Sequence, residues 1–398
     1  MLRNRNIIYF SNDWNTDHKV SSHHIAKELL KNNRLIYVET GGMRKPKASS
    51  RDLRRIFFRL VSWLRGIQKI DDNLYIYPLI IFPFHQKLAR SLNIYLNVFI
   101  LRRAIKKYKF KDPILWFVTP HVSYLANYLP KKFTVYYSTD NVSLAPGVDQ
   151  KAIECLENDL LHKADVVFGT SEYLCDRLRK KNINHHIFYS PQAVNVEHFS
   201  SVQKNNTSLA EEIKNLKKPV IGYIGLIEEW IDLDLIGYIA KSRPEWSIAL
   251  IGRVAVSVEN LKRFANIKFL GIKQYEDLPS YLKGFDVCIS PFKINEFTKG
   301  VNPIKIKEYL ASGKPVVSTH LPEMERFKDF IEIADSYEDF VQKIDQFLSY
   351  DDSGKITKRM ESVKNDNWQN RAEKISEIIE EIERLTINRQ YLSKDSSD

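Results

Sequence analysis

Residues 302–319 read N-P-I-K-I-K-E-Y-L-A-S-G-K-P-V-V-S-T, a pattern that predicts a short helix followed directly by a buried strand. Asn302 with Pro303 predicts the helix start, because an Asn side chain accepts from free N–H groups and proline suits the first helical position. Gly313 suits the left-handed residue that ends a helix, and Pro315 prevents its continuation. A helix that returns at once to an apolar strand is the repeating unit of an α/β fold.

The first turn of this helix carries an unusual charge pattern. Lys305 and Lys307 place cations where the helix dipole and the free N–H groups favour an anion. A bound diphosphate would remove this conflict, and Glu308 on a neighbouring face can accept both hydroxyls of a ribose. The alternative is an ordinary helix whose lysines extend into water, and the spacing alone favours that alternative.

The same alternation of short apolar strands and helices extends on both sides of this stretch. Strands of four to six residues rich in Val, Ile and Phe, each followed by a polar loop, are typical of parallel sheets buried on both faces. The expected strand cores are residues 7–10, 34–39, 114–118, 134–137, 166–169, 219–224, 246–251, 267–269, 285–290, 315–318 and 331–334.

The 398-residue chain suits two α/β domains of about 200 residues each. Residues 200–218 are polar and lysine-rich, so we expect the connection between the domains there. The predicted division is residues 1–200, residues 201–366, and a charged C-terminal helix with a frayed tail over residues 367–398. We expect this last helix to pack back on the first domain.

The cysteines and the apolar runs indicate the expected cellular compartment. Cys155, Cys175 and Cys288 are odd in number and widely scattered, which favours neither a disulfide framework nor a metal cluster. The apolar runs at residues 7–10 and 74–84 are too short for a signal-peptide core and a membrane span, respectively. A cytoplasmic location in a reducing compartment is expected.

The net charge of +11 is concentrated in one region. Residues 44–111 hold seventeen Lys or Arg and three acids, a local balance of 17 − 3 = +14, so the remaining chain is slightly acidic. Basic and apolar residues alternate around Arg54 and Arg55, which favours an interfacial helix on an anionic membrane surface. A core-facing helix with solvated charges fits equally well. No RNP or KH pattern accompanies the charge, so a nucleic-acid partner is not expected.

The quoted motif resembles the donor-nucleotide motif of bacterial GT-B glycosyltransferases related to family 4, including the teichuronic-acid and capsule-type enzymes. The resemblance implies two Rossmann-like βαβ domains that face a central cleft. It also implies that Glu308 binds the donor ribose and that basic residues near it, Lys305 first, bind the diphosphate at the helix start marked by Asn302.

Three further segments extend this resemblance. Residues 220–225 (V-I-G-Y-I-G) are similar to the first strand and glycine loop of the donor domain, which implies that a ligand approaches the backbone at Gly225. Arg253 follows a strand that in the family ends in a basic residue near the diphosphate. Tyr275 lies in residues 271–278, which resemble the loop that receives the base.

The sequence also departs from the family. Many relatives have a second Glu eight residues before the one matching Glu308, and this chain has Gly300 there. A retaining mechanism is therefore not supported by that position. The loop before Gly300 can still supply an acid in Glu296 and phosphate-binding groups in Thr298 and Lys299.

The expected acceptor side lies in the first domain. Ligands of open α/β sheets gather at the carboxyl ends of strands, and polar loops follow the strands at residues 114–118 and 134–137. Asp140 is the first candidate for the base that deprotonates an acceptor hydroxyl, and His121 is the second. The alternatives are a turn-forming Asp and a structural loop histidine.

These features predict transfer of a sugar from a nucleotide diphosphate donor to a carbohydrate or lipid-linked glycan acceptor in cell-envelope polysaccharide synthesis, with possible docking on the inner face of the membrane. A nucleotide-sugar 2-epimerase and a non-catalytic partner of the same fold stay open as alternatives. Asp232 and Asp234 form the one Asp-x-Asp pair, interpreted as a helix cap, so no cofactor and no metal are expected.

Overall fold

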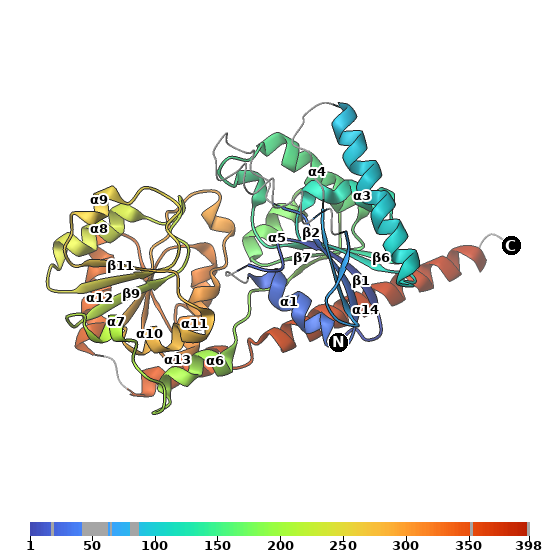
Figure 1. Cartoon of the computed structure of the whole chain (residues 1–398). Helices are drawn as coiled ribbons and strands as arrows, with labels where there is room; N and C mark the ends of the chain where they lie inside the picture. The colour runs from blue at the N-terminus through green and yellow to red at the C-terminus, as the bar shows by residue number, and fades with distance from the viewer. Residues whose placement is uncertain (17–19, 42–62, 64–65, 80–86, 351–352, 396–398) are drawn as a thin grey trace. The chain divides into compact units, whose positions relative to one another are not determined.

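The computed structural model describes residues 1–16, 20–41, 63, 66–79, 87–350 and 353–395. The chain divides into two compact units. Unit 1 comprises Met1–Pro191 with Gln369–Asp398, and unit 2 comprises Gln192–Trp368. In each unit, helices cover both faces of one sheet (Figure 1).

The sheet of unit 1 has the strand order β3-β4-β2-β1-β5-β6-β7-β8. Every neighbouring pair is parallel except β3 and β4, so the carboxyl ends of seven strands lie along one edge. The strands are β1 (Asn6–Ser11), β2 (Arg34–Glu39), β3 (Gln68–Lys69), β4 (Leu74–Pro78), β5 (Ile114–Phe117), β6 (Phe133–Ser138), β7 (Val166–Gly169) and β8 (Ile187–Tyr189).

The two faces of this sheet are packed differently. One face packs aliphatic and aromatic side chains into a core with helices α3, α4 and α5. The other carries a band of rings in which Tyr9 stacks on Tyr37 and Trp116, and the Tyr9 hydroxyl donates to Ser22 of α1. The helical segments are α1 (Ser21–Leu30), α3 (Lys87–Lys107), η1 (Pro120–Asn127), η2 (Val142–Leu144), α4 (Gln150–Lys163), α5 (Glu172–Arg179) and α14 (Trp368–Asp395).

The C-terminal helix α14 belongs almost entirely to unit 1. Glu383 of this helix is 6% exposed and accepts from Arg5 at 2.7 Å, just before β1. Lys132, just before β6, lies 3.8 Å from the same carboxylate. Two basic residues at the amino ends of two strands therefore hold α14 on the unit 1 sheet.

The sheet of unit 2 is entirely parallel, with the order β11-β10-β9-β12-β13-β14. Its four central strands are buried along their whole length, which explains their largely apolar sequences. The strands are β9 (Val220–Ile224), β10 (Ser247–Ile251), β11 (Ile267–Gly271), β12 (Val287–Ser290), β13 (Val316–Thr319) and β14 (Glu332–Ala334).

The predicted connection at residues 200–218 is wrong, because this segment is part of unit 2. Phe199 and Val202 are buried in its core, and Ile213 joins them. The compact units meet nine residues earlier in the sequence, after Pro191. The helical segments of unit 2 are α6 (Val196–Ser200), η3 (Ser201–Gln203), α7 (Glu211–Lys214), α8 (Leu233–Ser242), α9 (Glu259–Lys262), η4 (Tyr275–Asp277), α10 (Leu278–Lys283), η5 (Thr298–Gly300), α11 (Ile304–Ala311), η6 (Pro322–Phe327), α12 (Tyr337–Ser349) and α13 (Ser353–Val363).

The predicted capping role of Asp232 is confirmed, since its carboxylate accepts from the Leu235 amide at 3.0 Å at the start of α8. Residues 54–62, which carry most of the predicted interfacial segment, lie outside the described residues. Across the described part of the chain, no helix combines the length and the apolar character that a membrane span requires.

Candidate functional site

The loops at the carboxyl edge of the unit 2 sheet are hydrogen-bonded to one another. The Gly225 amide donates to Ile251 at the end of β10, at 2.9 Å. The Gly252 amide in turn donates to Gly271 at the end of β11, at 2.8 Å. Arg253, which is exposed, accepts through its carbonyl from the Ile227 amide at 2.9 Å. Two of the predicted donor-binding positions, Gly225 and Arg253, therefore lie in one fixed cluster of loops.

Gly252 is the tightest point of this cluster. Its φ of +139° is a conformation that residues with a side chain rarely adopt, and a Cβ there would lie 1.9 Å from the Gly225 carbonyl oxygen. The cluster thus depends on a glycine that the sequence analysis did not single out. The signal was present in the sequence, because Gly252 directly follows an apolar strand.

We expect Gly252→Ala to lower the free energy of unfolding by about 2–3 kcal/mol, because both the backbone angle and the contact with Gly225 are incompatible with a methyl group. Urea denaturation measures this change. Gly237→Ala is the matched control, since a Cβ at Gly237 in α8 meets nothing closer than 3.4 Å. Equal stability of the two variants would contradict the assigned role of Gly252.

Helix α11 begins one residue later than predicted. Pro303 occupies the cap position, and no side chain of the described residues caps the helix. The prediction that Asn302 caps it is therefore wrong, because Asn302 lies one residue before the cap position. Asn302 is 5% exposed, and its Nδ2 donates to Glu323 at 3.3 Å. Free backbone N–H groups at this helix start remain suited to an anion.

The two lysines of the first turn have different environments. Lys305 is partly exposed and its Nζ lies 2.5 Å from Glu308. Lys307 is buried, and its Nζ donates to the Gln192 carbonyl at 2.7 Å and to Asp366 at 2.5 Å. The interpretation of Lys307 as a cation facing the anion position is therefore wrong. Lys305 is the lysine of this turn that a ligand can reach.

Tyr275 lies near this pair. Its side chain packs against the core cluster that contains Ile306 and Tyr309 of α11. Burial raises the pKa of Tyr275, and the negative charge of Glu308 raises it further. The Tyr275 ring stacks on His198 with centroids 4.5 Å apart, and His198 Nε2 donates to the Tyr275 carbonyl at 2.9 Å. His198 is 77 residues away in sequence, and no spacing pattern indicates this contact.

The loop before α11 contributes less than predicted. The Thr298 hydroxyl is buried, donates to the Lys293 carbonyl at 2.6 Å and accepts from the Asn295 amide at 2.9 Å. Lys299 pairs with Glu296 at 2.5 Å. Thr298 therefore fixes the loop shape, and the structure gives its hydroxyl no free orientation toward a phosphate.

In unit 1, Asp140 and His121 follow the neighbouring parallel strands β6 and β5, so both lie at the carboxyl edge of the sheet. The loop that carries Asp140 is fixed by the Thr170 hydroxyl, which donates to the Thr139 carbonyl at 2.7 Å. His121 Nε2 donates to the Thr40 carbonyl at 3.2 Å. Asp140 is half-buried, and the loss of solvation raises its pKa to about 6.

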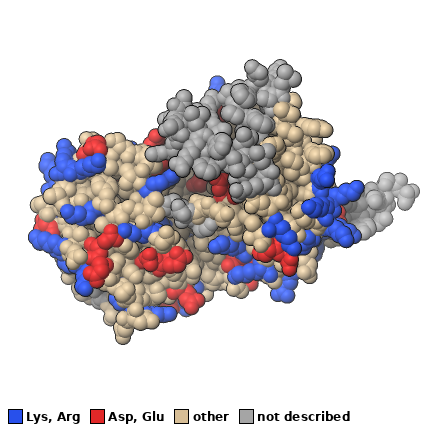
Figure 2. Space-filling view, viewed as in Figure 1, with Lys and Arg blue, Asp and Glu red and all other residues tan. Residues whose placement is uncertain are grey.

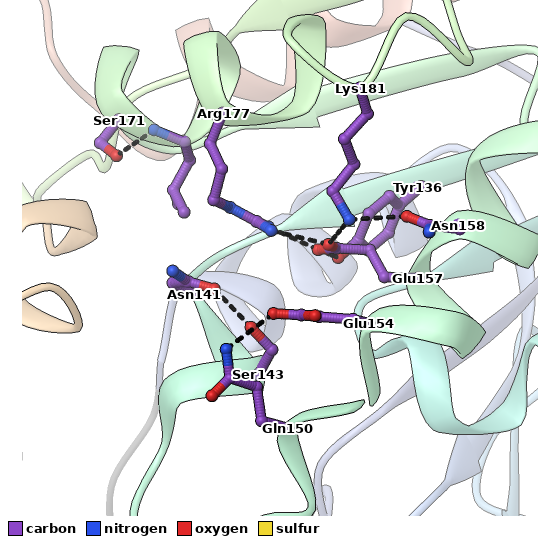
Figure 3. Close-up of polar contacts among 11 residues, drawn as sticks. Tyr136, Asn141, Ser143, Gln150, Glu154, Glu157, Asn158, Ser171, Arg177 and Lys181 are labelled. Atoms are coloured by element: carbon purple, nitrogen blue, oxygen red, sulfur yellow. Dashed lines mark hydrogen bonds and ion pairs between the residues drawn. The ribbon is translucent and has the colours of Figure 1, made fainter. Parts of the chain in front are cut away.

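A buried ionic cluster lies behind the strand that leads to Asp140. Glu157 of α4 is 1% exposed and accepts from Arg177 at 2.6 and 2.8 Å, from Lys181 at 3.0 Å and from the Tyr136 hydroxyl at 3.1 Å (Figure 3). Burial alone would raise the pKa of Glu157, but the two cations lower it below its ordinary value. The cluster ties two helices to β6 and so supports the Asp140 loop.

Part of unit 2 is similar to a known family. Residues 218–350 match the model of the family described as Glycosyl transferases group 1. This segment covers the central part of unit 2, including the loop cluster, α11 and the Tyr275 loop. This match supports the predicted class, a glycosyltransferase of GT-B fold, for the part of the chain that it covers.

A particular relative is TuaH of Bacillus subtilis (strain 168), whose proposed role is that of a teichuronic acid biosynthesis glycosyltransferase. The chain is 27% identical to it over 229 residues, which cover 54% of this chain and 57% of TuaH. The match therefore spans less than two thirds of the relative's length.

Solved structures share the fold over nearly the whole chain. Sucrose-phosphate synthase from Thermosynechococcus elongatus is similar with a TM-score of 0.69 and 13% identity, over 95% of this chain and 99% of that one. Anabaena HepE, solved in complex with UDP and glucose, has a TM-score of 0.64 and 13% identity, over 94% and 99%. These likenesses confirm the GT-B fold.

Proposed function

We propose that the chain transfers a sugar from a nucleotide diphosphate donor to a carbohydrate or lipid-linked glycan acceptor in cell-envelope polysaccharide synthesis. The observation that carries this proposal is the start of α11. Backbone N–H groups with no side-chain cap among the described residues, the accessible Lys305 and the carboxylate of Glu308 lie together there. These groups match a diphosphate followed by a ribose.

The neighbouring groups complete a donor site of the same kind. Tyr275 offers a ring and a backbone segment near Glu308 for the base, and the loops around Gly225 and Arg253 offer backbone and a cation for phosphate. TuaH and HepE support this assignment by their names and, for HepE, by the UDP in its structure. UDP-glucose is accordingly the first donor to test, followed by other UDP-, GDP- and dTDP-sugars.

We expect Glu308→Ala to weaken donor binding about 10- to 100-fold, because a hydrogen bond to a charged group contributes about 1.5–3 kcal/mol. Calorimetric titration with UDP-sugars measures this. Glu259→Ala is the matched control, since Glu259 forms the same kind of pair with a lysine three residues on, at 2.6 Å in α9. Failure of every common nucleotide sugar to bind the unmodified protein would overturn the proposed function.

For the chemical step we propose Asp140 as the base, with His121 as the second candidate. A conversion of a UDP-sugar without any acceptor would instead favour an epimerase. Donor binding without turnover, unchanged by Asp140→Ala, would favour a non-catalytic partner. We further propose that a metal ion is not required, and donor binding that survives EDTA would support this.

We also propose that the protein works at the inner face of the cell membrane, as a peripheral protein held by an anionic lipid surface. A lipid-linked acceptor would be presented there. The basic composition of residues 44–111 supports this part of the proposal.

A further inference from the structure

Helix α3 has apolar residues on two sides, and the sheet of unit 1 covers one of them. On the uncovered side, Leu92, Tyr95 and Phe99 are 49%, 68% and 53% exposed. Their spacing of three and four residues places them on one face, so they form a continuous stripe. The covered side packs into the core through Val98, Leu101, Ala104 and Ile105.

The stripe borders a shallow hollow of about 420 Å³. The Tyr95 and Phe99 rings stack with centroids 6.4 Å apart, and Tyr128, which is 42% exposed, lines the hollow as well. Arg102 holds this arrangement, because its Nε donates to the Tyr128 carbonyl at 2.7 Å. Four large apolar side chains, including Leu92, are therefore exposed on this side of unit 1.

The same face continues into a basic region. Arg102, Arg103 and Lys106 follow Phe99 at spacings of three, four and seven residues and are exposed. Residues 87–111 contain eight Lys or Arg and no acid. In Figure 2 the tan surface along α3 gives way to blue residues toward the carboxyl-terminal end of the helix.

We propose that this face, the α3 surface, docks on an anionic phospholipid membrane. It comprises Leu92, Tyr95, Phe99 and Tyr128 together with Arg102, Arg103 and Lys106. Tyrosine and phenylalanine rings bury their apolar parts at the boundary of headgroups and acyl chains, while neighbouring Lys and Arg contact lipid phosphates. The inference deepens the proposed location at the membrane by naming the surface responsible.

Charge argues for lipid over a second copy of the chain. A dimer through this face would bury Arg102, Arg103 and Lys106 against a helix surface whose sequence, residues 87–111, offers no carboxylate. Uncompensated like charges oppose such an interface. An anionic bilayer supplies the opposite charge to Arg102, Arg103 and Lys106.

Sedimentation with vesicles tests the proposal. The full chain is expected to bind phosphatidylglycerol-containing vesicles at least about tenfold more tightly than phosphatidylcholine vesicles, with binding that falls as salt rises. Reversal of two charges, Arg103→Glu with Lys106→Glu, is expected to weaken binding roughly 10- to 100-fold. Tyr95→Ser with Phe99→Ser is also expected to weaken vesicle binding. The binding that remains should be purely electrostatic and should disappear at high salt.

Matched controls lie in unit 2. Tyr350 is 63% exposed, so Tyr350→Ser removes a comparable ring. Lys268→Glu with Lys328→Glu reverses two exposed charges. Equal loss of vesicle binding in the α3 variants and the controls would overturn the proposal. So would unchanged binding of the α3 variants, or gel filtration showing a dimer that Phe99→Ser dissociates.

Vesicle binding and donor binding are expected to be independent of each other. Glu308→Ala is expected to keep full vesicle binding, and the α3 variants are expected to keep full affinity for nucleotide sugars. Thermal denaturation by circular dichroism verifies that each variant is folded. If the protein binds vesicles but no nucleotide, the proposed activity is refuted and the α3 surface is supported. If it binds nucleotide sugars but no vesicles, the α3 surface is refuted and the proposed activity is supported.

Discussion

Asp140→Asn is expected to lower kcat by about 10²- to 10⁴-fold, the usual contribution of a positioned general base. The asparagine keeps the size of the side chain and removes its basicity, so donor affinity should change little. Turnover of the nucleotide sugar with a soluble acceptor analogue measures the loss. Asp149→Asn is the matched control, because Asp149 caps α4 and asparagine caps a helix equally well.

The same substitution should stabilise the protein at neutral pH. The folded-state pKa of Asp140 is raised to about 6 from an ordinary value of 3.8, so the fold disfavours its carboxylate, and this cost grows as pH rises from about 4 to 6. Full conversion of that shift gives about 3 kcal/mol. Because the carboxylate is half-exposed, we expect Asp140→Asn to gain about 1–2 kcal/mol at pH 7 and nothing at pH 3.5.

The pH dependence of activity follows from the same ionisation. Wild-type kcat/KM should fall about tenfold per pH unit below pH 6, and the residual activity of Asp140→Asn should lack this fall. If Asp140→Asn retained wild-type turnover, the base would have to be sought elsewhere, first at His121. The pH profile of His121→Gln would then show whether His121 is the base, because loss of the base removes the fall in activity at low pH.

Glu157→Gln is expected to lower the free energy of unfolding by about 3–5 kcal/mol. Removal of one partner from a buried ionic cluster leaves Arg177 and Lys181 without a counter-charge in a site where Glu157 is 1% exposed. Urea denaturation at pH 7 measures the effect. Glu211→Gln is the control, because Glu211 pairs with Lys214 on the surface and should cost less than about 1 kcal/mol.

The stabilising contribution of Glu157 should also depend on pH with a definite sign. Its folded-state pKa is lowered, so the contribution is present above the ordinary value of 4.5 and is lost as pH falls through the folded-state pKa. The difference in stability between wild type and Glu157→Gln should therefore shrink in strongly acidic solution. A loss below about 1 kcal/mol at pH 7 would show that the cluster contributes little to stability.

The strand pattern was predictable because parallel strands buried on both faces are short apolar runs. β2 and β7 lie at the predicted residues, and nine further strands overlap the predicted ranges. Three strands were not predicted, namely β3, β4 and β8, and β3 has only two residues. Leu74–Pro78 merges into a longer apolar run with two prolines, and Ile187–Tyr189 has only three residues. Neither β4 nor β8 is a distinct apolar run of four to six residues between polar residues, which is the pattern that predicts a strand.

The structural roles of residues in the donor site were predictable only where they follow from the local backbone preferences of the residue itself. Gly313 and Pro315 mark the end of α11 by backbone conformation alone. The environment of Lys307 depends on Asp366, 59 residues away, and the stack on Tyr275 depends on His198. Contacts of this kind arise from tertiary packing and leave no trace in spacing, which is why Lys307 was assigned wrongly and His198 was missed.

Hydrogen–deuterium exchange of the full chain with and without a nucleotide-sugar donor tests whether the donor binds at the start of α11. Saturating donor is expected to slow exchange at the amides of Ile304 to Ile306 and in the loops around Gly225 and Gly252. Glu308→Ala should weaken this protection at equal donor concentration. Tight binding with unchanged exchange at the start of α11, and protection confined to other surfaces, would contradict the proposed donor site.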